Sequence, residues 1–312
     1  MESWRAVSDV LIAGHIVVDE VIDFRGQISP RRSLGGPASY SSLALTSLGF
    51  KPEVISKVGE DFPVGYCQLL QEKAGLDISH FISRNEKTTR FRIDRSINPR
   101  RLWLVSKCRD LSSMDFRLNS VQAISRPRAL IVNSVAGEIS LSLLDRISKE
   151  FDLVFVDSQG FVRKFSKNGE VEMRFGLDIS SLSGVDFLKA DRNELIAWTG
   201  LKDLEASVRQ IAKFTQYLII TSGPGNADIF EGQKLRWRSK PLEVNIADTT
   251  GAGDIFLAVF AATYSQSENI RTALSTAICA ATLSLETKGI EKALLARKRI
   301  ERASSEIEVR QY

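Results

Sequence analysis

Cysteine and long apolar runs are scarce in this chain of 312 residues. The three cysteines, Cys67, Cys108 and Cys279, lie far apart and show no C-x-x-C spacing. This pattern argues against a disulfide framework or a zinc site and favours a reducing compartment. No apolar run approaches the ~20 residues that span a bilayer, and no cationic-then-apolar leader opens the chain. We therefore expect a soluble, cytoplasmic protein that does not bind membranes.

A strong excess of charge of one sign is also missing. The chain has 42 Lys and Arg against 38 Asp and Glu, which gives a formal net charge of +4. Such a small and dispersed excess argues against nucleic acid as a partner. The one dense basic stretch, NPRRLWLVSKCR at 98–109, is expected to be a solvated loop and strand face. With 43% apolar residues, the chain can bury a sizeable globular core.

The sequence does contain a regular alternation of two patterns. Short apolar runs predict buried strands at the start of 9–24 and at 53–59, 129–135, 153–158, 185–190 and 217–223, with a hairpin at 227–239. Apolar residues at helical spacing predict helices within 35–50, 62–75, 141–151, 204–214, 249–265, 270–289 and 292–308. The alternation predicts an α/β fold, with a doubly wound, mostly parallel sheet and helices on both faces. Because no low-complexity linker or repeat divides the chain, we expect residues 1–312 to form one domain.

Two segments depart from this alternation and predict a small β lid. Residues 80–108 contain two polar-apolar alternating runs around an Asn-Pro turn, as in a hairpin with one exposed face. Together with about 18–33, this hairpin is expected to form an accessory sheet outside the main one. Four apolar positions of the hairpin would either cover a substrate within one subunit or pair two subunits as a homodimer: Phe91, Ile93, Leu102 and Leu104.

The stretch IADTTGAGDIFLAVF at 246–260 carries the clearest chemical signal. A helix that begins near Gly251 leaves its first N–H groups without intrahelical partners, and these groups attract an anion. Gly251 and Gly253 have no Cβ and Ala252 adds little bulk, so a phosphate can approach the backbone closely. The Asp254 carboxylate would repel that phosphate unless it accepts a proton from an attacking alcohol. The alternative is a plain turn in which Asp254 only caps the helix.

The full string D-T-T-G-A-G-D resembles the signature of the ribokinase-like (PfkB) sugar and nucleoside kinases. This resemblance extends over nearly the whole chain and implies a ribokinase-like fold and phosphorylation of an alcohol with ATP and Mg²⁺. By the resemblance, Gly251, Ala252 and Gly253 form the anion hole, and Asp254 is the catalytic base. Members of the family often bind a monovalent cation such as K⁺ beside this loop. Asp248 and Thr250 are its candidate neighbours here.

The N-terminal part resembles the elements of the same family that bind the acceptor. LGGPASYSSLALTSLG at 34–49 is similar to the di-glycine signature, which implies that Gly35 and Gly36 lie against the substrate. Asp19 matches a carboxylate that grips substrate hydroxyls. Its alternative role is that of a solvated turn residue. Tyr40 stands where ribokinases carry an asparagine, and this departure argues against ribose as the substrate.

Two further strings resemble the donor side of the family. KADRNEL at 189–195 is similar to the N-x-x-E element, so Asp191 and Glu194 are expected to hold Mg²⁺ through water. The same pair also fits a helix N-cap followed by a first-turn acid, and both roles are compatible. TSGPGNA at 221–227 resembles the T-x-G-x-x-G nucleotide loop, except that Asn226 replaces the last glycine and Gly225 comes one residue early. The candidate nucleotide contacts are Thr221, Gly223, Gly225 and Asn226.

Several local strings together look most like the archaeal myo-inositol kinase branch of the family. The most telling is DSQGFVR at 157–163, because a strand end with Asp157, Gln159 and Arg163 presents several hydrogen-bonding groups to a polyol. We expect Asp19, Gln159 and the backbone of the di-glycine to bind inositol hydroxyls. Arg163 is expected to hold the γ-phosphate or to close over the substrate, unless it is a surface arginine.

Other substrates and another class of protein remain as alternatives. A kinase of the same family acting on ribose, fructose, ketodeoxygluconate or a nucleoside would share the Asp254 mechanism. A nucleoside would be favoured by a lid aromatic that stacks on its base, for which Phe91 and Trp103 are the candidates. A non-catalytic regulator that binds a polyol or nucleotide would be marked by loss of the base or of the anion hole, and neither is lost here.

Overall fold

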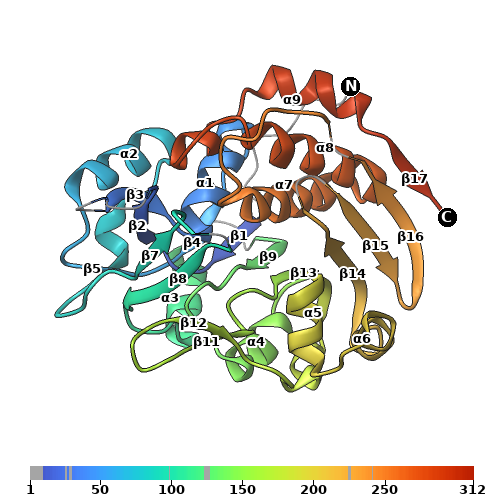
Figure 1. The fold of residues 1–312 in the computed structure, drawn as a ribbon, viewed down its shortest axis with the longest axis horizontal. Helices are drawn as coiled ribbons and strands as arrows, with labels where there is room; N and C mark the ends of the chain where they lie inside the picture. The colour runs from blue at the N-terminus through green and yellow to red at the C-terminus, as the bar shows by residue number, and fades with distance from the viewer. Residues whose placement is uncertain are drawn as a thin grey trace.

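The computed structural model describes residues 10–24, 27, 30–97, 99–122, 127–223, 226–240 and 242–312. Gly225, a predicted nucleotide contact, lies outside this part of the chain. Parts of the predicted lid segment 18–33 lie outside it as well. The described residues form a large sheet with helices on both faces and a smaller lid sheet (Figure 1).

The main sheet has nine strands among the described residues, in the order β17-β16-β15-β14-β13-β10-β9-β1-β4. The strands from β4 to β14 pair in parallel: β1 (Val10–Ala13), β4 (Glu53–Ile55), β9 (Ala129–Val132), β10 (Leu153–Asp157), β13 (Val185–Asp191) and β14 (Thr215–Thr221). Antiparallel strands extend the other edge: β15 (Ala227–Glu231), β16 (Lys234–Ser239) and β17 (Val309–Gln311). The predicted doubly wound, mostly parallel α/β fold is confirmed.

Helices cover both faces of this sheet (Figure 1). One layer contains α1 (Pro37–Ser47), α2 (Val64–Ala74), α7 (Ala252–Ser267), α8 (Ile270–Ser284) and α9 (Arg297–Ala303). The other contains α3 (Ser113–Gln122), α4 (Leu141–Ser148), α5 (Arg192–Thr199) and α6 (Leu204–Ile211). Helix α7 packs against the sheet, α1 and α8, and is therefore apolar almost all round. Within the ranges that the structure covers, no helix is both long enough and apolar enough to cross a membrane.

The two predicted lid segments form one four-stranded sheet, in the order β3-β2-β7-β8. Its strands are β2 (Val17–Ile22), β3 (Arg31–Gly35), β7 (Arg90–Asp94) and β8 (Arg101–Ser106). Of the two alternatives for the hairpin's apolar positions, their burial favours the one in which they cover the cavity within one subunit. Phe91 is buried in a small apolar cluster, and Leu102 and Leu104 are partly buried against that cluster. Ile93 is also buried and lines the cavity beneath the lid. A homodimer through the lid stays a prediction.

The sequence patterns missed several short elements. These are β6 (Ile82–Ser83), β11 (Arg163–Phe165), β12 (Val171–Met173), helix α3 and strand β17. The strand expected at 53–59 is divided into β4 and β5 (Val58–Gly59), and α5 begins where Asp191 and Glu194 also fitted a helix N-cap and a first-turn acid. The helix expected within 292–308 is also shorter than predicted. A 3₁₀ turn over Ile290–Ala293 precedes α9, because Lys292 points into the protein and is only 2% exposed.

Candidate active site

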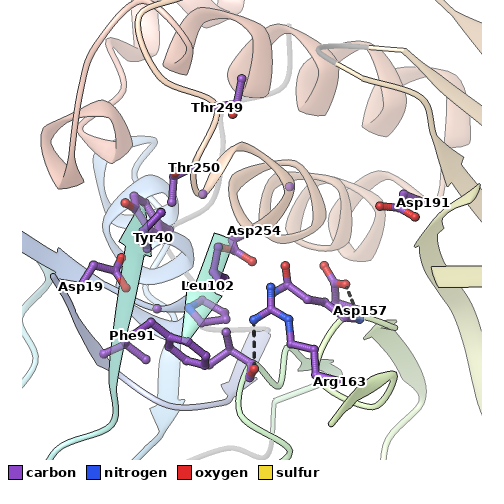
Figure 2. A pocket seen from close by; sticks show the side chains of 18 of the residues that line it. Asp19, Tyr40, Phe91, Leu102, Asp157, Arg163, Asp191, Thr249, Thr250 and Asp254 are labelled. Carbon is purple, nitrogen blue, oxygen red and sulfur yellow. Dashed lines mark hydrogen bonds between the residues drawn. The ribbon is translucent and has the colours of Figure 1, made fainter. Parts of the chain in front are cut away.

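A cavity of about 230 Å³ lies between the lid and the carboxyl ends of the parallel strands. In doubly wound folds, ligands bind at this edge of the sheet. The cavity brings together most of the residues that the sequence singled out: Asp19, Gly36, Asp157, Gln159, Arg163, Asp191, Glu194, Thr221, Thr250, Gly251, Gly253 and Asp254. In Figure 2, Asp254 lies between Asp19 and Tyr40 on one side and Asp157 and Arg163 on the other.

The glycine turn before α7 has the features of an anion-binding site. Gly251 is the N-cap of α7 and has a φ of 80°, a left-handed conformation that favours glycine. A Cβ at this position would lie 2.7 Å from the ring of Tyr40, which packs beneath the turn. Among the described residues, no group accepts a hydrogen bond from the N–H of Gly253 or Asp254. These two N–H groups at the helix N-terminus are therefore free to donate hydrogen bonds to a bound anion.

Asp254 lies in the first turn of α7 and borders the cavity. Its Oδ1 accepts a hydrogen bond from Nδ2 of Asn133 at 3.1 Å. Burial raises the pKa of Asp254 to about 7, helped by the nearby Asp157 carboxylate, while Lys189 and the Asn133 hydrogen bond lower it. A carboxyl group with a pKa near 7 is well matched to accept a proton from an alcohol near neutral pH.

Two polar residues of the site, Asn133 and Lys189, were missed by the sequence analysis. Lys189 lines the cavity, and its Nζ lies 3.1 Å from where a Cβ of Gly253 would be. Burial would lower the pKa of Lys189, but the carboxylates of Asp157 and Glu194 outweigh it and hold the pKa above its usual value. The turn therefore has a permanent positive charge beside it. The sequence feature that could have identified Asn133 and Lys189 is that each is a polar residue at or near the end of an apolar strand.

Asp157 was expected to offer its carboxylate to a polyol, but in the structure it pairs with Lys189. Its Oδ2 accepts a hydrogen bond from Nζ of Lys189 at 2.6 Å, and its Oδ1 accepts one from the N–H of Gln159 at 3.0 Å. Both oxygens are thus already engaged, although Asp157 lines the cavity as predicted. Its carboxylate holds the Lys189 ammonium in place.

Asp19 and the di-glycine meet on the lid side of the cavity. A Cβ on Gly35 would lie 2.1 Å from Oδ2 of Asp19, so only glycine lets this carboxylate approach the backbone. Gly36 has a φ of 86° and begins α1. The side chain of Asp19 is 6% exposed and accepts no hydrogen bond from any other described residue. Burial raises the pKa of Asp19 to about 7; Arg95 lowers it and Asp254 raises it.

Arg163 and Gln159 also line the cavity. The guanidinium of Arg163 donates a hydrogen bond to the carbonyl of Val135 at 3.1 Å, and its Cζ lies 5.7 Å from the centre of the Phe91 ring. The alternative of a surface arginine is therefore wrong. Figure 2 shows Arg163 beside Phe91 and below Asp254.

The acidic pair at the start of α5 forms a capping box. Asp191 Oδ1 accepts from the N–H of Glu194, and Glu194 Oε2 accepts from the N–H of Asp191 and from the hydroxyl of Ser158. Both residues also border the cavity. No group of three or more His, Cys, Asp and Glu that would bind a metal directly occurs among the described residues. The pair fits Mg²⁺ held through water, since each carboxylate keeps one oxygen outside the capping box.

The predicted nucleotide loop is only partly brought to the cavity. Thr221, at the end of β14, lines it. Gly223 and Asn226 are exposed, and Asn226 donates to the carbonyl of Ser222 at 3.4 Å. The structure therefore supports Thr221 as a contact more directly than it supports the two residues that follow.

Known proteins match this sequence and this fold. The pfkB family carbohydrate kinase model matches residues 11–296. The chain belongs to this family. It is 25% identical over 267 residues to a cytidine kinase of Thermococcus kodakarensis, covering 83% of this chain and 89% of that protein. It is 26% identical over 265 residues to an inositol 3-kinase of Arabidopsis thaliana, covering 80% of this chain and 65% of that protein.

Solved structures of the ribokinase family share the fold. A pyrophosphate-dependent kinase complexed with a pyrophosphate analog and myo-inositol has a TM-score of 0.78 at 20% identity, over 94% of this chain and 99% of that one. A fructokinase of Xylella fastidiosa with bound ATP has a TM-score of 0.75 at 16% identity, over 96% of this chain and 99% of that one. As a PfkB kinase, the chain is a phosphotransferase that uses an alcohol group as acceptor.

Proposed function

We propose that this PfkB kinase transfers the γ-phosphoryl group of ATP to a hydroxyl of a small polyol, with myo-inositol as the preferred acceptor. One observation carries the proposal. The Asp254 carboxylate, held by Asn133, lies in the first turn of α7 beside the unpartnered N–H groups of Gly253 and Asp254. A proton acceptor and an anion site next to each other are what phosphoryl transfer to an alcohol requires.

The reaction follows from this arrangement. Asp254 takes the proton of one acceptor hydroxyl as the oxygen attacks the γ-phosphorus. The new P–O bond forms while the bond to the β-phosphate oxygen breaks, and ADP leaves. The N–H of Gly253 and the ammonium of Lys189 stabilise the negative charge on the transferring group. The lid excludes water, which suppresses transfer of the phosphoryl group to water.

The donor is expected to lie along the wall formed by the ends of β13 and β14. Thr221 borders it there, and Asp191 and Glu194 would hold Mg²⁺ through water. When bound, Mg²⁺ neutralises charge on the β- and γ-phosphate oxygens. Free cysteines support a reducing, cytoplasmic setting for this chemistry.

A small, non-aromatic acceptor fits the lid side of the cavity best. The volume of about 230 Å³ is below the ~300–1,000 Å³ of sites for drug-sized ligands. Asp19 offers a carboxylate that has no hydrogen-bond donor among the described residues, and Gln159 offers an amide. Phe91 lines the cavity, but the Arg163 guanidinium lies over its ring at 5.7 Å from the centre, and Trp103 is not among the described residues that line the cavity. Neither aromatic is therefore well placed to stack on a nucleoside base.

A product assay with paired donors and acceptors tests the proposal. Purified protein is incubated with Mg²⁺ and either ATP or pyrophosphate, together with myo-inositol, ribose, fructose, ketodeoxygluconate, adenosine or cytidine. We expect phosphorylated myo-inositol with ATP, and none from Asp254→Asn. Faster turnover of cytidine or a furanose would contradict myo-inositol as the preferred acceptor. Faster turnover with pyrophosphate would contradict ATP as the donor. Ligand binding without any product would favour the non-catalytic regulator.

A further inference from the structure

A buried lysine contacts the back of the glycine turn. Lys292 comes from the 3₁₀ turn Ile290–Ala293, and its side chain is inaccessible to solvent. Its Nζ donates hydrogen bonds to the main-chain carbonyls of Asp248 at 2.5 Å and Thr250 at 2.9 Å. The same nitrogen lies 3.7 Å from Oδ2 of Asp248. Three oxygens, one of them charged, thus converge on one ammonium.

Two carbonyls and a carboxylate also form a donor set that suits a hard cation. Asp248 and Thr250 are the residues that the sequence analysis placed beside a monovalent cation. In this chain the Lys292 ammonium already occupies the position that these oxygens define, so the residues do not fit an additional K⁺ there. The two hydrogen bonds donated to carbonyls and the nearby carboxylate are the surroundings that an ammonium group favours.

We infer that Lys292 is a built-in cation that replaces a monovalent metal ion behind the phosphate-binding turn, so that this kinase works without K⁺. The inference rests on the proposed function, because the turn is taken to bind the transferring phosphoryl group. Lys292 is a positioning residue, since it contacts the turn and not the reacting atoms.

The contacts around Asp248 explain how the lysine would act. Asp248 Oδ1 accepts from the N–H of Thr250 at 2.9 Å and from the guanidinium of Arg95 at 2.9 Å. Its Oδ2 accepts from the N–H of Gly289 at 3.3 Å. Lys292 therefore completes a clamp that joins the turn, the segment after α8 and the lid. By fixing the two carbonyls, it fixes the direction of the free N–H groups that follow them.

Ion dependence of turnover tests the inference directly. Wild-type activity is measured at constant ionic strength in KCl, NH₄Cl, NaCl and choline chloride, and the rates are expected to agree. Lys292→Ala is expected to lose about 10- to 100-fold in choline chloride and to recover in KCl or NH₄Cl, as the vacated oxygens bind the added ion. Lys292→Met fills the space with an apolar chain and should stay slow in every salt. Lys298→Ala, which removes an exposed lysine nearby, is the matched control.

Thermal unfolding supplies a readout that needs no substrate. The melting temperature of Lys292→Ala should rise in KCl or NH₄Cl relative to choline chloride, whereas that of the wild type and of Lys298→Ala should not. Lys292→Gln replaces the alanine variant if that variant does not fold. Activation of the wild type by K⁺, or full activity of a folded Lys292→Ala in choline chloride, would overturn the inference. If no acceptor is turned over, the proposed function fails, and the melting temperatures still decide whether Lys292 fills a cation site.

Discussion

Asn133 Nδ2 donates a hydrogen bond to the Asp254 carboxylate at 3.1 Å, and so joins the residue after β9 to the first turn of α7. The other amide atom, Oδ1 of Asn133, is buried and has no hydrogen-bond partner within the part of the chain that the structure describes. An amide in this place stabilises the ionised form of Asp254 and orients it toward the cavity.

Substitution of Asn133 should therefore shift the pH profile of the reaction. Asn133→Ala removes the hydrogen bond that lowers the pKa of Asp254, so the acidic limb of kcat/KM should move to higher pH. Asn133→Asp adds a negative charge and should move it further. The profile is measured from about pH 5 to about pH 9. A limb that stays in place in both folded variants would contradict the positioning role.

Asp254→Asn should nearly abolish phosphoryl transfer. Without a proton acceptor, kcat should fall by about 10²- to 10⁴-fold, with little change in the KM for the acceptor. Steady-state rates at pH 8 measure this, and Asp145→Asn on the exposed surface of α4 is the control. A kcat within a factor of a few of the wild type would remove Asp254 from the mechanism.

The same variant should be more stable than the wild type at alkaline pH. The folded-state pKa of Asp254 is raised from 3.8 to about 7, so its contribution to stability falls as the pH rises between these values. Asparagine does not ionise, and above pH 7 the free energy of unfolding of Asp254→Asn should exceed that of the wild type by about 1–4 kcal/mol. Denaturant unfolding at about pH 4.5 and at pH 8 tests the sign. A constant difference at both pH values would contradict it.

Asp19→Asn should change both the KM for the acceptor and the pH profile of the reaction. Loss of the carboxylate should raise the KM for the acceptor about 10-fold or more, since a charged hydrogen bond contributes ~1.5–3 kcal/mol. The Asp254 carboxylate raises the pKa of Asp19, and repulsion between two carboxylates acts on both, so the acidic limb of the variant should lie at lower pH. Kinetics with varied acceptor and fixed ATP test both effects. An unchanged KM would place the acceptor elsewhere.

Gly251→Ala should destabilise the protein and damage the turn. The new Cβ would meet the Tyr40 ring at 2.7 Å in a backbone with φ of 80°, and we expect a loss of about 2–4 kcal/mol. Gly65→Ala is the matched control, because Gly65 lies exposed in α2 with no atom near its Cβ position. That change should stabilise by up to about 1 kcal/mol. Equal melting temperatures for the two variants would contradict the packing of the turn against Tyr40.

The strand and helix pattern and the glycine turn were predictable from neighbouring residues. Apolar periodicity identified the parallel strands and most helices, because each pattern is local to one element. The turn and Asp254 are contiguous, so they could be recognised together as one string, and the resemblance of that string to the PfkB signature implied their chemistry. The helix expected within 292–308 was too long, because its apolar spacing did not reveal that Lys292 turns inward.

The residues that complete the site lie far apart in the sequence. Asn133 and Asp254 are separated by 121 positions, and Lys292 is 44 positions from the carbonyl of Asp248 that it contacts. No local spacing relates such residues. Strand order decides which strand ends meet, and only packing decides which polar groups are buried together.

The sequence by itself determined that this protein has an α/β fold with a glycine turn and a carboxylate at the end of that turn. Tertiary structure alone decided that Asn133 holds that carboxylate, that burial raises its pKa to about 7, and that Lys189 and Lys292 surround the turn with positive charge. The physical reason is that hydrogen-bond partners and pKa values depend on distance and desolvation in space, which the order of residues along the chain does not specify.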